Sequence, residues 1–281
     1  MVGGSGEAVS ARAGLGFFKM SGSGNDFVVV DARENPHEEL RSPQVIQRLS
    51  ARGTGVGADG LVLLAAEPGA DFRMIYYNAD GSRASMCGNA ALCCTRLATE
   101  LGGGTPRELR FATDSGIVTG RVVAGRPEID LAPVAMVRPE APVGLAAGES
   151  RIGYALAGVP HLTVLVDDLE KADVAHRGRA LRFAPELGPD GANANFVAPE
   201  GQGWAMRTYE RGVEAETLAC GTGAVASAIL IHSWGLATAP IDLRTRSGRT
   251  LSVKLERDGD HFLPTLAGEG RIVFRGELVE L

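Results

Sequence analysis

The chain has 281 residues, and its 28 lysines and arginines stand against 34 aspartates and glutamates, so its net charge is −6. This acidic balance, without a lysine- or arginine-rich run, argues against nucleic-acid binding. No apolar run approaches the roughly 18 residues that a membrane-spanning helix needs, so the sequence argues against an integral membrane protein. Residues 1–16 lack the apolar stretch of a secretory signal, so we interpret them as a flexible leader and expect the protein in the reducing cytoplasm.

Short β-branched runs, separated by glycine, aspartate or asparagine, recur along the chain and are typical of a largely antiparallel sheet. In chain order, the expected strands are Phe27–Asp31, Leu61–Ala65, Phe72–Asn78, Leu109–Ala112, Ile117–Val123, His161–Val166, Asn195–Val197, Trp204–Tyr209, Ile241–Arg244 and Leu251–Leu255. Three segments are predicted to be helical. Ser42–Arg52 opens on a serine and a proline, which favour a helix start, whereas Gly88–Leu101 and Gly221–Trp234 each follow a cysteine.

The two cysteine-led helices belong to an internal repeat. Cys87 and Cys220 are 133 positions apart, and two similar strands, ending at Asp31 and Asp167, are 136 positions apart. Two landmarks at nearly one offset predict a duplicated domain of roughly 130 residues. The expected divisions are the leader (1–16), a first half (17–135), a second half (136–265) and a closing segment (266–281) that returns to the first half.

A cysteine at the start of a helix lies in the positive end of the helix dipole, which favours its thiolate. The small residues that follow, Gly88 and Ala90 in one helix and Gly221 and Gly223 in the other, leave the first backbone N–H groups free to bind a carboxylate or a phosphate. One such cysteine is more often an inert core residue, but two at matching places in a repeat favour a shared site. Two thiols on opposite faces of one α-carbon could remove a proton from one side and return one on the other. The pattern therefore predicts racemisation or epimerisation.

Sequence patterns for cofactors and metals are not found. No glycine-rich dinucleotide loop and no Walker loop occurs, and neither a CxxC pair nor a cluster of histidines offers zinc ligands. We therefore expect no cofactor and no metal, although Lys19, Lys171 and Lys254 leave pyridoxal phosphate open.

Six collinear motifs, which span nearly the whole chain from Phe17 onward, resemble the diaminopimelate epimerase family. They are FFKMSGSGNDFVVVD (17–31), RGTGVGADG (52–60), YNADGSRASMCGN (77–89), GVPHLTVLVDD (158–168), NANF (193–196) and YERGVEAETLACGTGA (209–224). The resemblance implies a pyridoxal-independent α+β (α/β) enzyme with two pseudo-symmetric, homologous domains. Each would be a mostly antiparallel sheet wrapped around a central helix, with the active site in the cleft between them. It also implies interconversion of LL- and meso-2,6-diaminopimelate, on the route to lysine and peptidoglycan, by a homodimer.

The same resemblance implies roles for individual residues. Cys87 and Cys220 would be the base and acid pair and would exchange roles with the direction of reaction. His161 would lie near the first cysteine and tune its proton, and Glu210 would meet the substrate ammonium group. The other implied substrate contacts are the backbone amides of Gly88, Asn89, Gly221 and Thr222 for the reacting carboxylate, and Asn25, Asn78, Asn193 and Arg211 for the far amino-acid end.

The chain departs from the family pattern at substrate-facing positions. Val159 stands where the family usually has an asparagine, and Gly60 replaces a common glutamine. Val159 keeps open a racemase of another amino acid, of the histidine or proline type, and a non-catalytic amino-acid-binding relative is a further alternative. Asn78, Asn193 and Arg211 favour diaminopimelate, because they suit a substrate with a second charged end.

Overall fold

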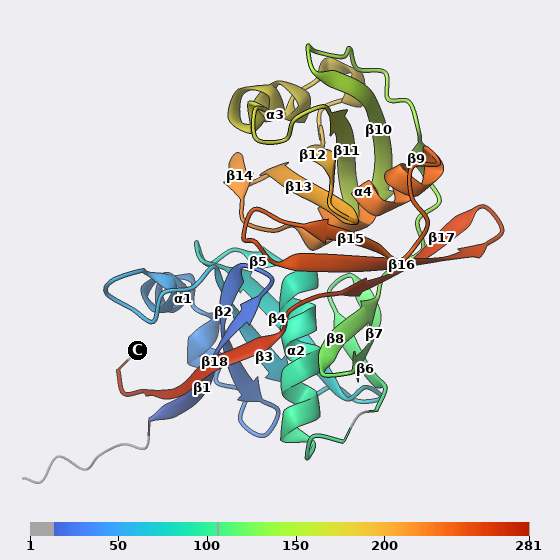
Figure 1. Ribbon diagram of the computed structural model, residues 1–281. Helices are drawn as coiled ribbons and strands as arrows, with labels where there is room; N and C mark the ends of the chain where they lie inside the picture. Colours follow the sequence, from blue (N-terminus) through green and yellow to red (C-terminus); the bar gives the residue numbers. More distant parts are fainter. Residues whose placement is uncertain (1–13, 106, 281) are drawn as a thin grey trace, which may run out of the picture.

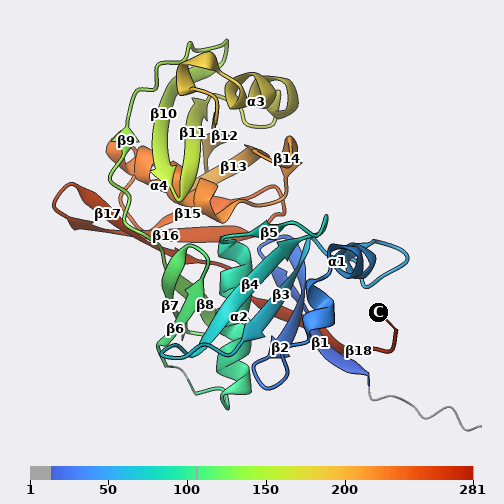
Figure 2. The ribbon, with the colours of Figure 1, turned by 180° about the vertical axis from the view of Figure 1, so that it is seen from behind.

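The computed structural model describes residues 14–105 and 107–280, and residues 1–13 of the expected leader lie outside this range. Strands and helices build two lobes, one above the other in Figure 1 and seen from behind in Figure 2. The strands of the lower lobe are β1 (Leu15–Gly22), β2 (Asn25–Ala32), β3 (Gly60–Ala65), β4 (Phe72–Asn78), β5 (Arg83–Ala84), β6 (Leu109–Thr113), β7 (Gly116–Val123) and β8 (Arg126–Asp130). The later strands are β9 (Val137–Arg138), β10 (Glu149–Ala157), β11 (Val159–Val166), β12 (Asn193–Glu200), β13 (Gly203–Glu210), β14 (Ala215–Thr217), β15 (Ile241–Arg244), β16 (Thr250–Asp258), β17 (His261–Ala267) and β18 (Arg271–Leu278).

The two halves repeat one strand topology. In the first half, β2 pairs in parallel with β3 and β4 pairs in parallel with β6, while the other neighbours are antiparallel. In the second half, β11–β12 and β13–β15 are the parallel pairs, at the equivalent places in the order. The predicted α+β class, with two homologous and mostly antiparallel halves, is confirmed.

Each half wraps its strands around one central helix, α2 (Gly88–Leu101) or α4 (Gly221–Ser233). Helix α4 carries apolar side chains on every side, which is typical of a helix that is buried all round. In α2 only Arg96, Glu100 and Leu101 lie outside the buried set. The outer faces of the halves carry α1 (Pro43–Ser50), preceded by the short η1 (Glu38–Arg41), and α3 (Val174–Arg182), followed by η2 (Pro185–Leu187).

Helix α3 differs from the sequence prediction, which has only three helices. Its start is fixed by Asp173, whose carboxylate accepts a hydrogen bond of 3.0 Å from the N–H of His176. Only Val174, Gly178 and Leu181 of the helix are buried. So sparse an apolar pattern does not stand out in a sequence, and the helix is stabilised by packing on β12 and β13.

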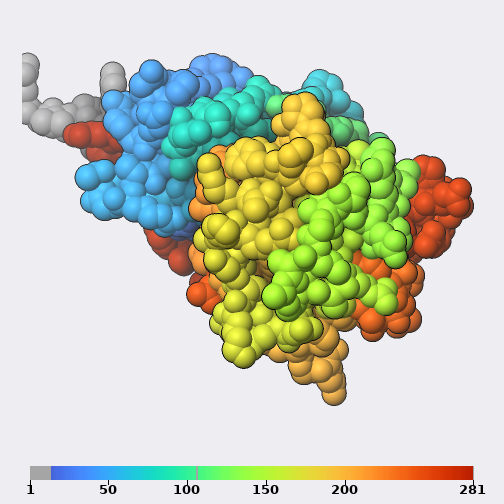
Figure 3. Space-filling view, turned by 90° about the horizontal axis from the view of Figure 1, so that it is seen from above, coloured from blue at the N-terminus to red at the C-terminus, as the bar shows by residue number. Residues whose placement is uncertain are grey.

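Strand pairing joins the halves. β8 pairs with β17 in antiparallel fashion, and β18 returns to pair with β1, which begins inside the range expected for the leader. One hydrophobic core runs through both halves around α2 and α4, whereas smaller cores lie under α1 and α3. In Figure 3 the second half lies in front, and the blue N-terminal part of the first half emerges on one side of it. The starts of α2 and α4 therefore lie inside a core that the two halves share.

Candidate functional site

The two central helices begin against each other. Cys87 and Cys220 each precede the first helical turn in nearly the same extended conformation, with φ −140° and ψ 117° for one and φ −134° and ψ 112° for the other. A Cβ atom at Gly221 would lie 3.5 Å from the Cα atom of Gly88. Side chains larger than a methyl group at these positions would therefore push the helix ends apart. The glycines allow the two helix starts to lie in contact between the halves.

The first N–H groups of an α-helix have no partner within the helix. The helical hydrogen bonds begin with the N–H groups of Ala91 and Ala224, which donate to the carbonyl oxygens of Cys87 and Cys220 at 2.9 Å each. The three N–H groups before them in each helix lie at the positive end of a helix dipole. Two such ends that meet suit a single carboxylate, held from both halves.

Burial keeps both thiols protonated at neutral pH. It raises the pKa of Cys87 to about 11, and the carboxylate of Glu210 adds to the rise, although N–H groups of Ala90 and Asn89 act in the opposite direction. Burial, again with Glu210, also raises the pKa of Cys220, which is 7% exposed. The same carboxylate thus opposes ionisation of both cysteines, so both sulfurs lie within electrostatic range of Glu210.

The end of β13 is held in place by Asn193. The backbone N–H of Arg211 donates to Asn193 Oδ1 at 2.7 Å, and Asn193 Nδ2 donates to the carbonyl oxygen of Pro160 at 3.2 Å. Burial raises the pKa of Glu210 above that of an ordinary glutamate. Asn193 therefore ties the Glu210–Arg211 peptide to the start of β11.

His161 is completely buried, and Asn195 orients its ring. Asn195 Nδ2 donates to His161 Nδ1 at 3.2 Å and to the carbonyl oxygen of Leu162 at 2.8 Å, while Thr208 Oγ1 donates to Asn195 Oδ1 at 2.9 Å. An amide nitrogen can only donate, so Nδ1 accepts and the ring proton lies on Nε2. Nε2 has no hydrogen-bond partner among the described residues. The expected closeness of His161 to Cys87 stays a prediction.

Asn195 was not among the predicted site residues, although the NANF motif contains it. Residues 193 and 195 lie on the same face of β12, because side chains alternate along a strand. This alternation was the signal that could have identified it.

The stability of the protein should fall on acidification because of His161. Burial, and to a smaller extent the charge of Arg211, lowers the pKa of His161 from 6.5 to about 3. Stability is therefore fully present above pH 6.5 and is lost as the pH falls toward 3, since only the unfolded chain takes up the proton. The shift corresponds to at most about 5 kcal/mol. Urea unfolding at pH 7 and pH 4.5 measures the loss.

The matched variant for this prediction is His161→Gln, which removes the titrating ring. Relative to its own stability at pH 7, the variant should lose less free energy of unfolding at pH 4.5 than the wild type. His176→Gln, at an exposed position, should behave as the wild type does. Equal losses in the wild type and His161→Gln would show that the imidazole does not cause the acid sensitivity.

A polar network supports the start of α2. Asn89 Nδ2 donates to Asn25 Oδ1 at 2.7 Å, and Asn25 Nδ2 donates to Asp59 Oδ2 at 3.0 Å. Arg52 bridges Asp59 and Asp26 at 2.8 and 2.6 Å. Asn25 and Asn89, both predicted site residues, are thus brought together, and Asp59 holds them. The sequence analysis missed Asp59, although it is the last residue but one of the glycine-rich RGTGVGADG motif.

Tyr76 is another residue that the sequence analysis missed. It lies two positions before Asn78 in β4 and therefore on the same face. A Cβ atom at Gly60 would lie 2.6 Å from Tyr76 Cε2 and 3.2 Å from its hydroxyl oxygen, so the ring lies over Gly60. Phe27 packs edge-to-face on the ring, with centroids 5.9 Å apart. Burial raises the pKa of Tyr76, so the phenol stays protonated. The departure at Gly60 has a physical reason, because only glycine leaves room for this ring.

A cavity of about 270 Å³ opens between the halves; Glu210 and Asn193 line it, whereas neither Cys87 nor Cys220 does. Its charged and amide side chains come from the second half, and its apolar side chains come mainly from the first. The polar wall includes Asn193, Glu210, Arg211 and Thr222, and the apolar residues include Met86, Ile117, Val118, Leu131, Val134 and Val159. Asn78 and Asn25 do not line this cavity, and Asn78 Nδ2 donates to Ser82 Oγ at 3.0 Å within its own turn.

Two further searches cover residues 14–105 and 107–280. Within these ranges, no three histidine, cysteine, aspartate or glutamate side chains gather as metal ligands would. No helix in the same part of the chain is both long and apolar enough to cross a membrane.

Solved structures of low sequence identity share the fold. A PhzF-family phenazine biosynthesis protein from Bacillus anthracis aligns over 95% of this chain and 99% of its own, with a TM-score of 0.72 and 15% identity. A hydroxyproline epimerase from Agrobacterium vitis aligns over 95% of this chain and 93% of its own, with a TM-score of 0.65 and 17% identity.

Sequence relatives are much more similar. The family model described as diaminopimelate epimerase matches residues 17–136 and 153–271. A protein named diaminopimelate epimerase from Gemmatimonas aurantiaca is 47% identical, over 95% of this chain and 100% of its own length. Another of that name, from Aquifex aeolicus, is 40% identical over 94% of this chain and 98% of its own. The cysteine-led helix starts thus occur in a chain that belongs to the diaminopimelate epimerase family.

Proposed function

We propose that this isomerase interconverts LL- and meso-2,6-diaminopimelate by two-base proton transfer at one α-carbon. The observation that carries the mechanism is the meeting of two helix starts, each preceded by a cysteine, at Gly88 and Gly221. The family and its named relatives support the substrate. Cys87 and Cys220 would face opposite sides of the α-carbon, and the reacting carboxylate would lie between the helix ends.

The transfer balances without a cofactor. One sulfur, as thiolate, takes the α-proton, and the C–H electron pair moves into the Cα–carboxylate system. The other sulfur, as thiol, gives its proton to the opposite face, so one thiolate and one thiol remain with their roles exchanged. Negative charge on the carboxylate grows during the transfer. The N–H groups at both helix starts, fixed before the reaction, stabilise that charge.

The burial that makes a thiolate scarce also makes it a stronger base. The pKa of Cys87, about 11, is closer to the high pKa of the α-proton than the pKa of an ordinary thiol is. The proton transfer to the Cys87 thiolate is therefore less unfavourable. Glu210, a half-buried carboxylate within electrostatic range of both cysteines, would pair with the substrate ammonium group. Neutralising Glu210 would in turn remove one cause that opposes thiolate formation.

The far end of the substrate would meet the polar wall of the cavity. Arg211 offers a guanidinium group there. Asn193 fixes the backbone of Arg211 by accepting a hydrogen bond from its N–H group. Asn25 and Asn78 would contact the same end of the substrate from the first half, where β2 and β4 reach the start of α2. His161, with its proton on Nε2, would donate toward the reacting centre.

Tyr76 would position the substrate or the first cysteine through its hydroxyl group. The Tyr76→Phe variant keeps the ring over Gly60 and against Phe27 but removes one hydrogen-bonding group. We expect kcat/KM to fall about 10-fold, as for the loss of one hydrogen bond, and the acid limb of the pH–kcat/KM profile to move.

The matched control for this prediction is Tyr77→Phe, on the other face of β4, where the ring packs in the smaller core of the first half. It should leave both the rate and the pH profile unchanged. A Tyr76→Phe enzyme that has the wild-type profile and rate would remove the hydroxyl from the mechanism.

The test of the function is α-proton exchange in D₂O with LL-diaminopimelate and no added cofactor. Proton NMR should show loss of the α-proton signal, and chromatography on a chiral phase should show the meso isomer accumulate. Histidine, proline and glutamate are measured in the same assay. Exchange of one of these, with diaminopimelate inert, would overturn the substrate and favour the alternative that Val159 keeps open.

A homodimer along β18 accompanies the proposal. Among the described residues β18 pairs only with β1, and it exposes apolar side chains such as Phe274, 47% exposed. Edge strands of this kind readily pair with another chain. Sedimentation velocity should show a dimer for the wild type and a monomer for Phe274→Lys. Phe183→Lys, at a position 51% exposed at the end of α3, is the control and should stay dimeric. A wild-type monomer would contradict the proposal.

Since both thiols must stay reduced, we also place the enzyme in the cytoplasm.

A further inference from the structure

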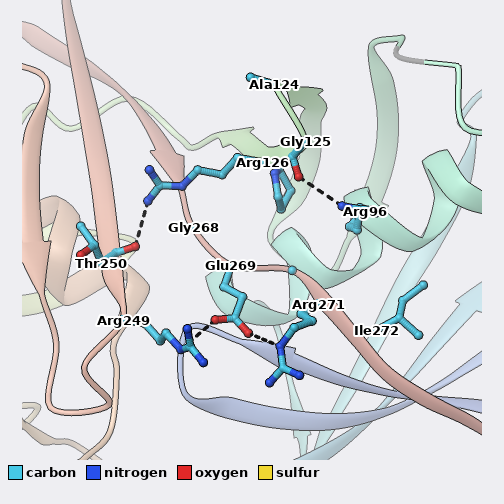
Figure 4. A pocket seen from close by; sticks show the side chains of 12 residues that line it. Arg96, Ala124, Gly125, Arg126, Arg249, Thr250, Gly268, Glu269, Arg271 and Ile272 are labelled. Carbon is cyan, nitrogen blue, oxygen red and sulfur yellow. Dashed lines mark hydrogen bonds and ion pairs between the residues drawn. The ribbon is translucent and has the colours of Figure 1, made fainter.

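A second cavity, of about 600 Å³, lies where the two halves join, apart from the cysteines. It takes side chains from both halves and from the segment that connects them. Arg96 comes from α2 and Arg126 from β8, and Arg249 comes from the turn before β16. Glu269 comes from the connection into β18, and Arg271 is the first residue of β18. Figure 4 shows Glu269 between Arg249 and Arg271, Arg126 reaching toward Thr250, and Arg96 beside Gly125.

The lining of this cavity is strongly positive although the protein as a whole is acidic. Four guanidinium groups face one lining carboxylate, that of Glu269, which Arg249 and Arg271 share at 3.0 and 2.8 Å. Among the described residues, the guanidinium group of Arg126 donates hydrogen bonds only to carbonyl oxygens, those of Thr250 at 2.8 Å and Ala267 at 3.4 Å. At least two positive charges are therefore not neutralised, even when the ion pair of Arg96 with Glu100 is counted.

Residues 268–270, which connect β17 to β18, are packed too tightly to move aside. A Cβ atom at Gly270 would lie 2.8 Å from Pro127 Cγ and 2.9 Å from the carbonyl oxygen of Leu92. The N–H of Glu269 donates to Ser23 Oγ at 3.0 Å. One wall of the cavity is therefore fixed in place. The planar fork of each guanidinium suits the oxygens of a phosphoryl group.

We infer that this cavity binds a small multivalent anion of the diphosphate class, free or as part of a nucleotide. Arg126 would hold one phosphoryl group from the first half and Arg249 the other from the second half. The volume exceeds what a single phosphate needs, and the arginines stand on both sides of the junction. Such a ligand would bridge the halves at a place separate from the reacting carboxylate.

Isothermal titration of the full chain with pyrophosphate, at low ionic strength, tests the inference. We expect saturable binding, at least about 10-fold weaker in Arg126→Gln and in Arg249→Gln, because each removes one guanidinium contact. Glu269→Gln should bind several-fold more tightly, since it removes the one competing carboxylate. The control Arg110→Gln, at an exposed position outside the cavity, should leave binding unchanged.

No turnover is needed for this measurement, so its result is independent of the proposed reaction. ADP titrated in parallel distinguishes the two sources of the diphosphate group, because only a nucleotide site would prefer it to pyrophosphate. The inference would be overturned if neither pyrophosphate nor ADP showed saturable binding up to about 10 mM. A dissociation constant that high corresponds to weak surface association. Binding that none of the three cavity variants changes would also overturn the inference.

Discussion

Replacing either Cys87 or Cys220 by alanine should abolish epimerisation, with a loss in kcat/KM of at least about 10³-fold. In the proposed mechanism each sulfur acts once per turnover, one as base and the other as acid. Removal of one leaves a face of the α-carbon without a proton donor or acceptor. The variants are assayed in both directions, from LL- and from meso-diaminopimelate, by α-proton exchange in D₂O and by separation of the isomers.

Residual exchange gives a sharper readout than the loss of rate. In each variant the remaining thiolate faces one side only, so exchange without inversion should be confined to one stereoisomer, and the two variants should select opposite ones. Cys94→Ala is the control, since this buried cysteine of α2 lies in the core and should change activity only slightly. Near-normal turnover in either single variant at position 87 or 220 would refute the two-base mechanism.

Gly223→Ala should lower kcat about 100-fold, the second largest effect that we expect. A Cβ atom at this position would clash with Asn195 Oδ1 and would lie 3.2 Å from Cys220 Sγ. Asn195 would have to move, and with it the hydrogen bond to His161 Nδ1 that orients the imidazole. Crowding of a packed interior also costs about 1–3 kcal/mol of stability. Rates and urea unfolding are measured together, so that loss of fold and loss of alignment are separated.

Gly16→Ala is the matched control, because no atom lies within 4 Å of a Cβ built there. It should leave both kcat and stability unchanged. If Gly223→Ala is folded and fully active, the arrangement of Asn195, His161 and Cys220 is not part of the catalytic machinery. A change confined to KM would indicate substrate binding rather than proton transfer.

The local pattern of the chain was enough to locate the two helix starts at which we propose that the reaction takes place. A cysteine followed by glycine and an apolar run predicts a helix start with exposed amides, and both helices occur where predicted, with α4 ending one residue early. The repeat offset predicted two homologous halves. The helices could be predicted because hydrophobic periodicity is a property of short segments. Helix α3 was missed because its few buried residues carry almost no pattern.

Only the tertiary structure decided what surrounds those positions. Asn195, Asp59 and Tyr76 matter through partners distant in sequence, such as Thr208, Asn25 and Gly60, and no local period encodes such pairs. The same holds for the arginine cavity, which four separate segments build where β8 meets β17. Hydrophobic alternation specifies which face of a strand is buried, but long-range strand pairing and packing decide which polar groups that face finally meets.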